Sequence, residues 1–576
     1  MKTAPAAVLL VACALAGQAQ MTRDQRRIDF QTLAAQFAKR YGPYEWKRDL
    51  LNVDLLHIGP WLDRAANARD DLDFYETCID YVAQLQDGHV GFYLPSDFVA
   101  SLGFTVDLYD GRPLIESVSR TRLPAKTYSF EIGDELVSID GLPVSDLLDA
   151  FSKYQMVASP HGTRRLAAQL LTVRPQEIMP HAPEVGEKAV VVVRRQNGDT
   201  ETYEIPWTKT GVPLNSVGPV LTPQSAARGR RSASLPHPRL DGPADYLAPL
   251  RPLLHAALPR PRALAGFGAL RPLFAVPPNF QTRLGSNSFS DAFFSGTYEA
   301  GGRKLGYIRI PSFAPDIDTA SAINQFQREI LYFQANTDGL IVDVMRNAGG
   351  YPDYAVELAR RLIPRTFRAT TYELRATAEW VWTFSQLYQQ ARAGGAPQYV
   401  LDGIQSLLGD VREAYAENRG RTGPLALSGL YMDPPTWTAD IPPVTDRAGN
   451  VVAYSKPVMV LIDEMSFSAA DMFPAMLQDN GAAILFGTRT AGLGGMVAEY
   501  DAGAYSEALV GITLGLAVRK GPIVTPDYPT TAYIENVGVR PDIEEDYMTR
   551  DNLVNRGRTF VEDFTGALVA HILSRE

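Results

Sequence analysis

The sequence predicts a multidomain α+β protein, in which an N-terminal helical segment and a β-rich middle region precede an α/β domain with a mostly parallel sheet. Three successive patterns along the 576 residues support this prediction. Apolar residues recur at helical spacing up to about residue 94, short β-like runs follow up to Trp207, and strands alternate with helices from about Ser286 onward. With 45% hydrophobic and 21% charged residues, the composition is that of a globular protein and excludes a wholly disordered chain.

The first 20 residues have the pattern of an export signal. Lys2 supplies a positive charge, Ala4–Ala16 is a short apolar run, and small residues follow it. Cleavage of this segment predicts an exported protein, periplasmic or secreted. The stretch Leu10–Cys13 also resembles a lipoprotein box, and the alternative is therefore a lipoprotein attached to a membrane through Cys13. We expect membrane association only in that case.

The remaining sequence divides into five parts by residue pattern. Residues 21–98 are predicted to be helical, with Phe30, Leu33 and Phe37 on one helix face, and residues 99–207 to be rich in strands. Residues 208–285 are rich in Pro, Ala and Arg, which favours a linker or an insertion. Residues 286–550 form the predicted α/β domain, and residues 551–576 a C-terminal helix. Four apolar runs suit buried strands of the α/β domain: Leu305–Ile310, Leu340–Val344, Val458–Ile462 and Ala483–Phe486.

Charge and residue counts exclude several classes of function. The net charge of −10 disfavours a nucleic-acid partner, because no basic surface can dominate. Two cysteines, Cys13 and Cys78, cannot build a disulfide framework or a multi-cysteine metal site. The seven histidines form neither an HxH nor an HExxH pattern. We therefore predict no metal and no cofactor, and leave the oligomeric state open.

A serine lies where a predicted strand runs into a helix. In Asp463–Asp471 the apolar strand is followed by a tight turn, and the helix begins next to Ser468. Unpaired backbone N–H groups at a helix N-terminus can stabilise a developing oxyanion beside a nucleophilic hydroxyl. The alternative is that Ser466 or Ser468 only caps the helix, with Asp471 favouring the helix dipole.

Two further motifs bear on that choice. Arg346–Gly350 ends in two glycines directly after a predicted strand, where active sites of α/β sheets gather. By itself it is equally an ordinary strand-to-helix turn. Gln86–Val90 contains His89, and a serine nucleophile needs a base of this kind near neutral pH. A lone histidine is otherwise more often a surface residue or a core residue with its hydrogen bonds made.

Taken in order, these motifs resemble those of the C-terminal processing (tail-specific) serine peptidase family. The stretches that carry the resemblance are Asp87–His89, Arg346–Gly350, Ser466–Asp471, Gln478–Gly481, Gly487–Thr490 and Glu535–Ile543. The resemblance covers about residues 23–543, apart from the Pro/Ala/Arg-rich part. It implies a serine peptidase that acts on a peptide or protein substrate and needs no cofactor.

The family has two catalytic variants, and the residues distinguish them. In the processing-protease branch a lysine follows the nucleophile, whereas this chain has Leu493 at the matching position, which disfavours a Ser–Lys dyad. The tricorn-core branch uses a histidine from the N-terminal segment, a serine and a supporting glutamate. His89 and Ser468 fit this branch, and the resemblance implies Glu535 as the supporting acid. One departure is Gly88, which stands where the tricorn enzymes have a serine before the histidine.

These roles define the expected chemistry. Ser468 attacks a peptide carbonyl while His89 takes its proton and later returns it to the leaving amine. The backbone N–H groups of Gly350 (or Gly349) and Ala469 hold the oxyanion.

The middle region has its own resemblance. Ser101–Phe104 is similar to the carboxylate-binding loop of PDZ domains, and Gly133–Gly141 to a strand and turn of the bacterial ones. This implies a PDZ-like domain over residues 99–207 that captures substrate tails. The alternative is a module that gates or spaces the domains. The predicted peptide-binding residues are Leu102, Gly103 and Phe104.

Two other function classes stay open, because a fold does not fix a function. One is a catalytically silent relative that binds peptides or hydrophobic ligands, as retinoid-binding proteins built on a similar fold do. The other is an envelope scaffold that acts mainly through its PDZ-like domain.

Overall fold

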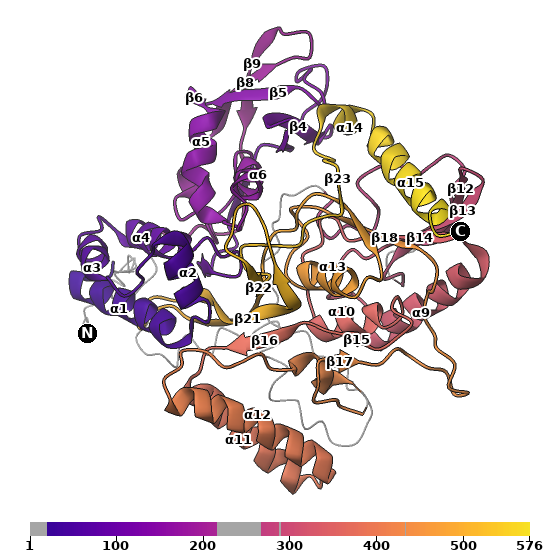
Figure 1. Ribbon diagram of the computed structural model, residues 1–576. Helices are drawn as coiled ribbons and strands as arrows, with labels where there is room; N and C mark the ends of the chain where they lie inside the picture. The colour runs from indigo at the N-terminus through magenta and orange to yellow at the C-terminus, as the bar shows by residue number, and fades with distance from the viewer. Residues whose placement is uncertain (1–19, 216–265, 287–289, 433) are drawn as a thin grey trace, which may run out of the picture.

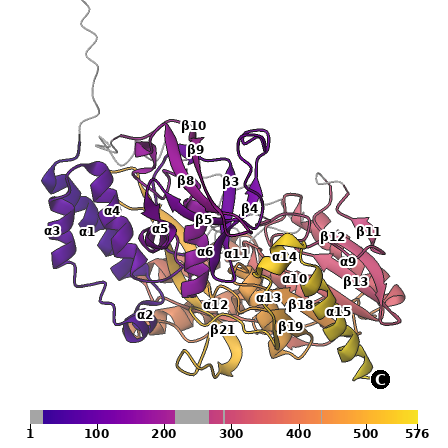
Figure 2. The same cartoon turned by 90° about the horizontal axis from the view of Figure 1, so that it is seen from above.

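The computed structural model describes residues 20–215, 266–286, 290–432 and 434–576. The predicted export signal with Cys13 and most of the predicted linker therefore lie outside the described residues. A helical N-terminal segment (indigo) and a strand-rich domain (purple) lie beside a larger α/β domain, as Figures 1 and 2 show from two directions. The predicted multidomain α+β fold is confirmed. Among the described residues, no helix combines the length and apolar content needed to cross a membrane.

The N-terminal segment packs its helices around one apolar face. Phe30, Leu33 and Phe37 lie on the buried side of the first helix, as the spacing predicts. After the last helix the chain forms a short strand that pairs antiparallel with strand β21 of the α/β domain. This pairing attaches the end of the segment, and with it the turn that carries His89, to the α/β domain. The elements are α1 (Arg23–Arg40), α2 (Tyr44–Leu51), α3 (Gly59–Ala66), α4 (Asp71–Ala83) and β1 (Gly91–Tyr93), and β21 is Leu509–Ile523.

The strand-rich domain contains a six-stranded sheet with two helices against it. Its order is β3-β4-β5-β8-β9, with β6 paired to β5, and helix α6 packs against the edge strand β3. A small second sheet has the order β10-β2-β7. The bounds are β2 (Val99–Ser101), β3 (Phe104–Tyr109), β4 (Arg112–Val118), β5 (Glu135–Ile139), β6 (Leu142–Pro143), α5 (Val144–Phe151), α6 (Pro160–Leu170), β7 (Val173–Pro175), β8 (Lys188–Arg194), β9 (Thr200–Pro206) and β10 (Thr208–Thr210).

The α/β domain is built on a seven-stranded sheet of order β11-β12-β13-β14-β18-β19-β23. The pairs β11–β12 and β12–β13 are antiparallel, and all pairs from β13 to β23 are parallel. The sheet is therefore mostly parallel, as predicted. Its strands are β11 (Gln281–Leu284), β12 (Phe294–Ala300), β13 (Arg303–Arg309), β14 (Gly339–Asp343), β18 (Val458–Ile462), β19 (Ile484–Gly487) and β23 (Ile543–Glu544).

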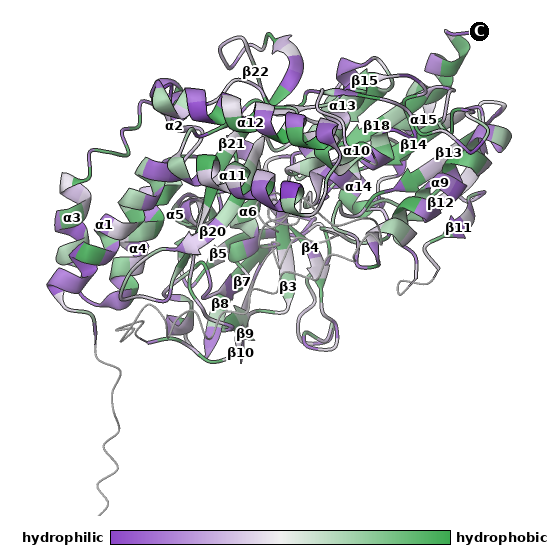
Figure 3. Ribbon diagram, turned by 90° about the horizontal axis from the view of Figure 1, so that it is seen from below, coloured by the Kyte–Doolittle hydropathy of each residue, from purple (hydrophilic) through white to green (hydrophobic). Residues whose placement is uncertain are grey.

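Both faces of this sheet are covered, which explains why its central strands are apolar throughout. On β14, Leu340 and Val342 point to the face that holds α9, α10 and α13, while Ile341 points to the face covered by α15. Figure 3 shows β14 and β18 as largely hydrophobic. The helices are α9 (Thr319–Asn336), α10 (Pro352–Ala359), α13 (Ala469–Asp479), α14 (Arg550–Val554) and α15 (Arg558–Leu573).

A second sheet connects the N-terminal segment to the α/β domain. Strand β21 pairs with β1, β16 (Thr371–Leu374), β20 (Gly495–Asp501) and β22 (Thr531–Tyr533). Two antiparallel helices, α11 (Ala378–Ala393) and α12 (Gln398–Ala416), form the long insertion at the bottom of Figure 1, close to the two-stranded sheet of β15 (Phe367–Arg368) and β17 (Asp440–Ile441). Strands β10 and β11 show that both ends of the predicted linker, residues 208–285, belong to the neighbouring sheets.

Candidate active site

Ser468 stands in the turn between strand β18 and helix α13. It is the residue before the first residue of α13, and its backbone has φ 57° and ψ −111°. A positive φ is costly for a residue with a side chain, and such strain concentrates at functional sites. Its N–H donates to Asp471 Oδ2 at 2.7 Å.

Asp471 ties this turn to the loop that follows strand β19. Its carboxylate also accepts from the backbone N–H groups of Gly492 at 2.8 Å and Leu493 at 3.2 Å. The side chain is fully buried, and burial raises its pKa to about 6 against these hydrogen bonds. Asp471 therefore does more than favour the helix dipole, since it fixes two segments around Ser468.

The glycine pair after β14 lies against the same serine. A Cβ on Gly349 would come within 2.8 Å of Ser468 Cβ, so the approach requires a glycine. The Gly349 N–H donates to Asn347 Oδ1. The backbone of Phe313 donates to the Gly349 carbonyl and accepts from the Tyr351 N–H, so these bonds leave the Gly350 N–H unused. Gly350 is thus better placed than Gly349 to offer an N–H. Ala469 is the first residue of α13, where the N–H has no partner within the helix.

A small pocket opens beside these groups. Ser468 and Gly350 both line it, and the rest of its wall is mainly apolar. The lining residues are Gly350, Pro352, Tyr372, Ser468, Gly495, Met496 and Val497.

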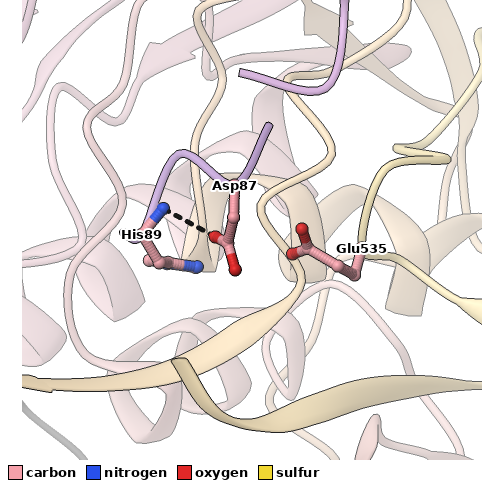
Figure 4. Close-up of side chains that lie close together, drawn as sticks. All are labelled: Asp87, His89 and Glu535. Carbon is pink, nitrogen blue, oxygen red and sulfur yellow. Dashed lines mark hydrogen bonds between the residues drawn. The ribbon is translucent and has the colours of Figure 1, made fainter. Parts of the chain in front are cut away.

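His89 lies with Asp87 and Glu535 in a buried cluster. One ligand-type atom of each side chain lies within 4.8 Å of the others, and Figure 4 shows Asp87 between the other two. Asp87 Oδ1 accepts from the backbone N–H of His89 at 2.9 Å, and Asp87 Oδ2 accepts from the hydroxyls of Tyr41 at 2.9 Å and Thr513 at 2.8 Å. Asp87 thereby fixes the turn rather than the imidazole ring.

The imidazole of His89 is fully buried, and neither ring nitrogen has a hydrogen-bond partner. Burial lowers its pKa to about 4, and Asp87 opposes that shift only in part. The ring is therefore neutral near pH 7, which is the form that a general base requires. Buried polar atoms without partners are rare, and each needs an explanation.

Glu535 is equally buried and is paired with a cation. Its Oε1 accepts from Lys47 Nζ at 2.6 Å, and its Oε2 from the Gly494 N–H at 3.1 Å. Burial and the nearby Asp87 raise its pKa, while the charge and the hydrogen bond of Lys47 act in the opposite direction. Carboxylates and a histidine in this arrangement are also potential metal ligands, but the Lys47 ammonium already supplies positive charge to the site.

The structure brings His89 and Ser468 to one region of the molecule without joining them. A Cβ on Gly495, which lines the pocket of Ser468, would lie 3.5 Å from His89 Nδ1. Because both ring nitrogens lack hydrogen-bond partners, the bond from Ser468 to His89 is not formed in this structure.

Gly88 and Leu493, the two departures from the family pattern, pack against each other. A Cβ on Gly88 would lie 2.8 Å from Leu493 Cδ2. Leu493, which stands where the processing-protease branch has a lysine, thus fills the space beside Gly88, which stands where the tricorn enzymes have a serine.

The predicted peptide-binding loop is folded into its own domain. Leu102 and Phe104 are buried. The N–H of Leu102 donates to Thr172 O at 3.0 Å, and that of Gly103 to Ser101 Oγ at 3.3 Å. These donors are therefore already occupied in this structure and do not face a free carboxylate site.

The same domain contacts the catalytic loops through buried ion pairs that sequence reasoning missed. Arg346, the first residue of the loop to Gly350, contacts Asp107 at 3.2 Å and Glu116 at 2.8 Å. Arg165 pairs with the same Asp107 at 3.0 Å. Lys47 is another missed residue. These pairs join positions far apart in the chain, and a single sequence carries no local signal for such contacts.

Comparisons with known proteins identify the two larger domains. Residues 304–545 match the model of peptidase family S41, and residues 99–213 match a PDZ domain model. A protein of Chlamydia trachomatis serovar D is 25% identical over 585 residues, covering 93% of this chain and 91% of its own length. A protein of Chlamydia pneumoniae is 23% identical and covers 96% of this chain and 91% of its own length.

Solved structures agree on the fold. The structure of mature CPAF complexed with lactacystin has a TM-score of 0.73 and 22% identity, and covers 96% of this chain and 99% of its own. The crystal structure of mature CPAF has a TM-score of 0.72 at the same identity, and covers 96% of this chain and 98% of its own. The described site lies between segments of the matched catalytic domain and the N-terminal segment. Residues 304–545 therefore form a domain similar to peptidase family S41, and the chain is a serine peptidase with a PDZ domain.

Proposed function

We propose that the protein hydrolyses peptide bonds by a Ser–His mechanism in which Ser468 is the nucleophile, His89 the general base and Glu535 the supporting acid. The observation that carries this proposal is the buried, neutral imidazole of His89, which has no hydrogen-bond partner and lies next to the pocket of Ser468. A structural histidine in such a position would make hydrogen bonds.

The roles follow from the chemistry of each group. A serine hydroxyl is a weak nucleophile until a base accepts its proton, and a neutral imidazole is suited to do so. The imidazolium that forms is stabilised by the carboxylates of Asp87 and Glu535. The N–H groups of Gly350 and Ala469 are proposed to hold the negative oxygen of the tetrahedral intermediate.

Ser468 and His89 are not hydrogen-bonded in this structure, so the mechanism requires substrate binding to bring them together. Catalytic hydrogen bonds are often long without ligand and tighten in the complex. We propose that a peptide in the pocket brings β20 and the His89 turn into the reactive arrangement. The missing hydrogen bond between Ser468 and His89 is also the one observation that favours a catalytically silent peptide-binding protein. Labelling of the serine distinguishes the peptidase from the silent protein.

The test is covalent labelling with a fluorophosphonate probe, which reacts with activated serines. We expect the purified protein to be labelled, and Ser468→Ala to abolish both labelling and peptide hydrolysis. Ser145→Ala, at an exposed serine of the PDZ domain, is the matched control and should behave as wild type. Labelling that persists in Ser468→Ala would identify another nucleophile, and absence of labelling in the wild type would favour the silent relative.

For the PDZ domain, we propose support of the catalytic loops rather than capture of a substrate tail. The N–H groups of Leu102 and Gly103 already have acceptors, and Arg165 and Asp107 form a buried pair between α6 and β3. A peptide ending in a free carboxylate and its amidated form should therefore be cleaved with similar KM. A KM at least tenfold lower for the free carboxylate would restore tail recognition.

Export is part of the proposal and rests on the N-terminal sequence. Lys2, the apolar run Ala4–Ala16 and the small residues after it match a cleavable signal. Mass spectrometry of the protein from a host that exports it should find an N-terminus near residue 20. An N-terminus at a lipid-modified Cys13 would support the lipoprotein alternative.

A further inference from the structure

Lys47, on helix α2, is one of the most buried charged residues of the described chain. Its side chain is 1% exposed. Lysine is almost never buried to this degree unless it is paired. Its partner, Glu535, is also 1% exposed, and their atoms Nζ and Oε1 are 2.6 Å apart. Burying two charges costs several kcal/mol per ion, so such a pair is weak evidence for a role in stability alone.

The contacts of Lys47 connect the two polypeptide segments that form the cluster. Besides Glu535, its ammonium donates to the carbonyl oxygen of Gln86 at 3.0 Å, directly before Asp87. Gln86 has a positive φ of 44°, so the turn that leads to His89 starts from a strained residue held by this bond.

The preceding residue repeats the pattern. Trp46 Nε1 donates to Asn536 Oδ1 at 3.0 Å, and Asn536 Nδ2 donates to the same Gln86 carbonyl at 3.3 Å. Two consecutive residues of α2 thus bind two consecutive residues of the closing motif, and both pairs converge on the start of the His89 turn. Helix α2 holds the supporting acid and the base in register.

We propose that Lys47 is a positioning residue of the active site, whose ammonium holds the Glu535 carboxylate against the turn that carries His89. This inference rests on the proposed Ser–His mechanism and adds to it a residue that acts through Glu535 rather than on the substrate.

The electrostatics of the cluster agree with this role. Burial and Asp87 raise the pKa of Glu535, and Lys47 lowers it by its charge and its hydrogen bond. Lys47 also lowers the pKa of His89, which Asp87 raises. The other titratable group of the cluster, Tyr41, donates its hydroxyl to Asp87. Without Lys47, Glu535 holds its proton to higher pH and no longer presents a negative charge to the imidazolium, while the imidazole itself becomes easier to protonate.

The experiment compares Lys47→Met and Lys47→Arg with the wild type in kcat, KM and the pH profile of kcat/KM. For Lys47→Met we expect kcat to fall by about 10- to 100-fold, as for other partners that orient an active group. KM should change by less than about threefold, because Lys47 does not line the pocket. The acid limb of the profile should move to higher pH, and Lys47→Arg, which keeps the charge, should recover part of kcat and the wild-type limb.

Two controls separate positioning from general destabilisation. Arg26→Met breaks another buried ion pair of the N-terminal segment, with Asp71 at 3.1 Å, away from the cluster. It should lower the melting temperature without moving the acid limb. In a double-mutant cycle with Glu535→Gln, the Lys47→Met effect on kcat should be largely absent, because its partner is gone.

The proposal is overturned if Lys47→Met leaves kcat and the pH profile unchanged, if its loss follows melting temperature as in Arg26→Met, or if the cycle is additive. Should Lys47→Arg not fold, the cycle alone decides. These outcomes apply once Ser468→Ala and His89→Ala have been shown to abolish activity. Activity that survives Ser468→Ala would instead refute the proposed function itself, so the two failures are distinct.

Discussion

Two regions outside the catalytic domain contact its active-site loops, and they do so in opposite ways. The PDZ domain uses ion pairs in which the charged groups are matched. The N-terminal segment contributes a cluster that contains an imidazole with no partner at all. From this difference we expect the PDZ contact to contribute mainly to stability and the N-terminal contact mainly to catalysis.

The PDZ contact consists of buried groups that are paired or hydrogen-bonded. Arg346 is fully buried, has a positive φ of 48°, and is held by Asp107 and Glu116. At the start of the other loop, Glu464 accepts from His161 Nδ1 at 2.7 Å and from Ser159 Oγ at 3.2 Å. The two strand ends that lead to Gly350 and to Ser468 are therefore held by one domain.

The N-terminal contact leaves one group without a hydrogen-bond partner. Asp87 and Glu535 have their hydrogen bonds made, and only the ring of His89 does not. Removing a matched ion of the PDZ contact should therefore lower the free energy of unfolding first, whereas removing the imidazole without a partner should lower activity first. The predictions below test this contrast, from the largest expected effect to the smallest.

His89→Ala should lower kcat/KM by on the order of 10⁴- to 10⁶-fold, because the serine loses its base. The free energy of unfolding should change by about 1 kcal/mol or less, since the cavity that forms is offset by the loss of two unpaired buried nitrogens. Hydrolysis kinetics and urea denaturation measure both quantities. His57→Ala, at an exposed histidine of the same segment, is the control. A large loss of stability would return His89 to a structural role.

Arg346→Met should lower the free energy of unfolding by about 3–5 kcal/mol, because it leaves buried carboxylates without their partner. Arg194→Met, which breaks a partly exposed pair with Glu135 in the PDZ domain, should cost about 1 kcal/mol or less. Urea denaturation of both variants gives the comparison. Equal losses would show that the buried network does not support the loops more than a surface pair does.

The pH dependence of stability should differ between wild type and His89→Ala. The pKa of His89 is lowered to about 4 in the folded protein, so between pH 4 and 6.5 the unfolded chain binds a proton that the folded one does not. Its contribution is present above pH 6.5 and is lost as the pH falls through 4. Relative to wild type, the variant should therefore gain up to about 3 kcal/mol between pH 7 and pH 4.

The comparison isolates the histidine because the other shifted groups remain in both proteins. Asp471, with a pKa raised to about 6, acts in the opposite direction, and its contribution is lost as the pH rises. It cancels in the difference. A constant difference between pH 4 and 7 would contradict the lowered pKa of His89.

The sequence predicted most of the fold because the relevant signals are local. Strand Val458–Ile462 has the predicted bounds, and the strand predicted at Ala483–Phe486 is shifted by one residue, to Ile484–Gly487. Both follow from apolar periodicity, which short-range sequence patterns record well. An insertion at about residues 376–443 was predicted, but not its two helices, α11 and α12. The sheet positions of residues 208–210 and 281–284 were missed, since short strands depend on their pairing partners.

For the active site, residue identity was predictable and mutual geometry was not. The order of motifs singled out Ser468, His89 and Glu535, and their assigned roles remain predictions. The roles of Lys47, Arg346 and Asp471 depend on contacts between segments far apart in the chain. A single sequence does not show that Lys47 and Arg346 are buried in ion pairs, because the same residue types are usually exposed.

The smallest effect concerns Gly88 and Leu493, and it tests whether the N-terminal contact tolerates the serine found in the tricorn enzymes. Gly88→Ser should lower the free energy of unfolding by about 1–3 kcal/mol, because its Cβ would lie 2.8 Å from Leu493 Cδ2. Gly59→Ser is the control, since a Cβ there meets nothing within 4 Å. Denaturation of both variants measures the difference.

Combining Gly88→Ser with Leu493→Ala tests whether the loss of stability comes from the contact between these two positions. Leu493→Ala opens space next to residue 88, so the double variant should lose less than the sum of the two single losses. Strict additivity would mean that the two positions are independent and that the loss in Gly88→Ser does not come from the contact with Leu493. Coupling would mean that glycine and leucine form one packed unit, in which neither branch's pattern can be restored by a single substitution.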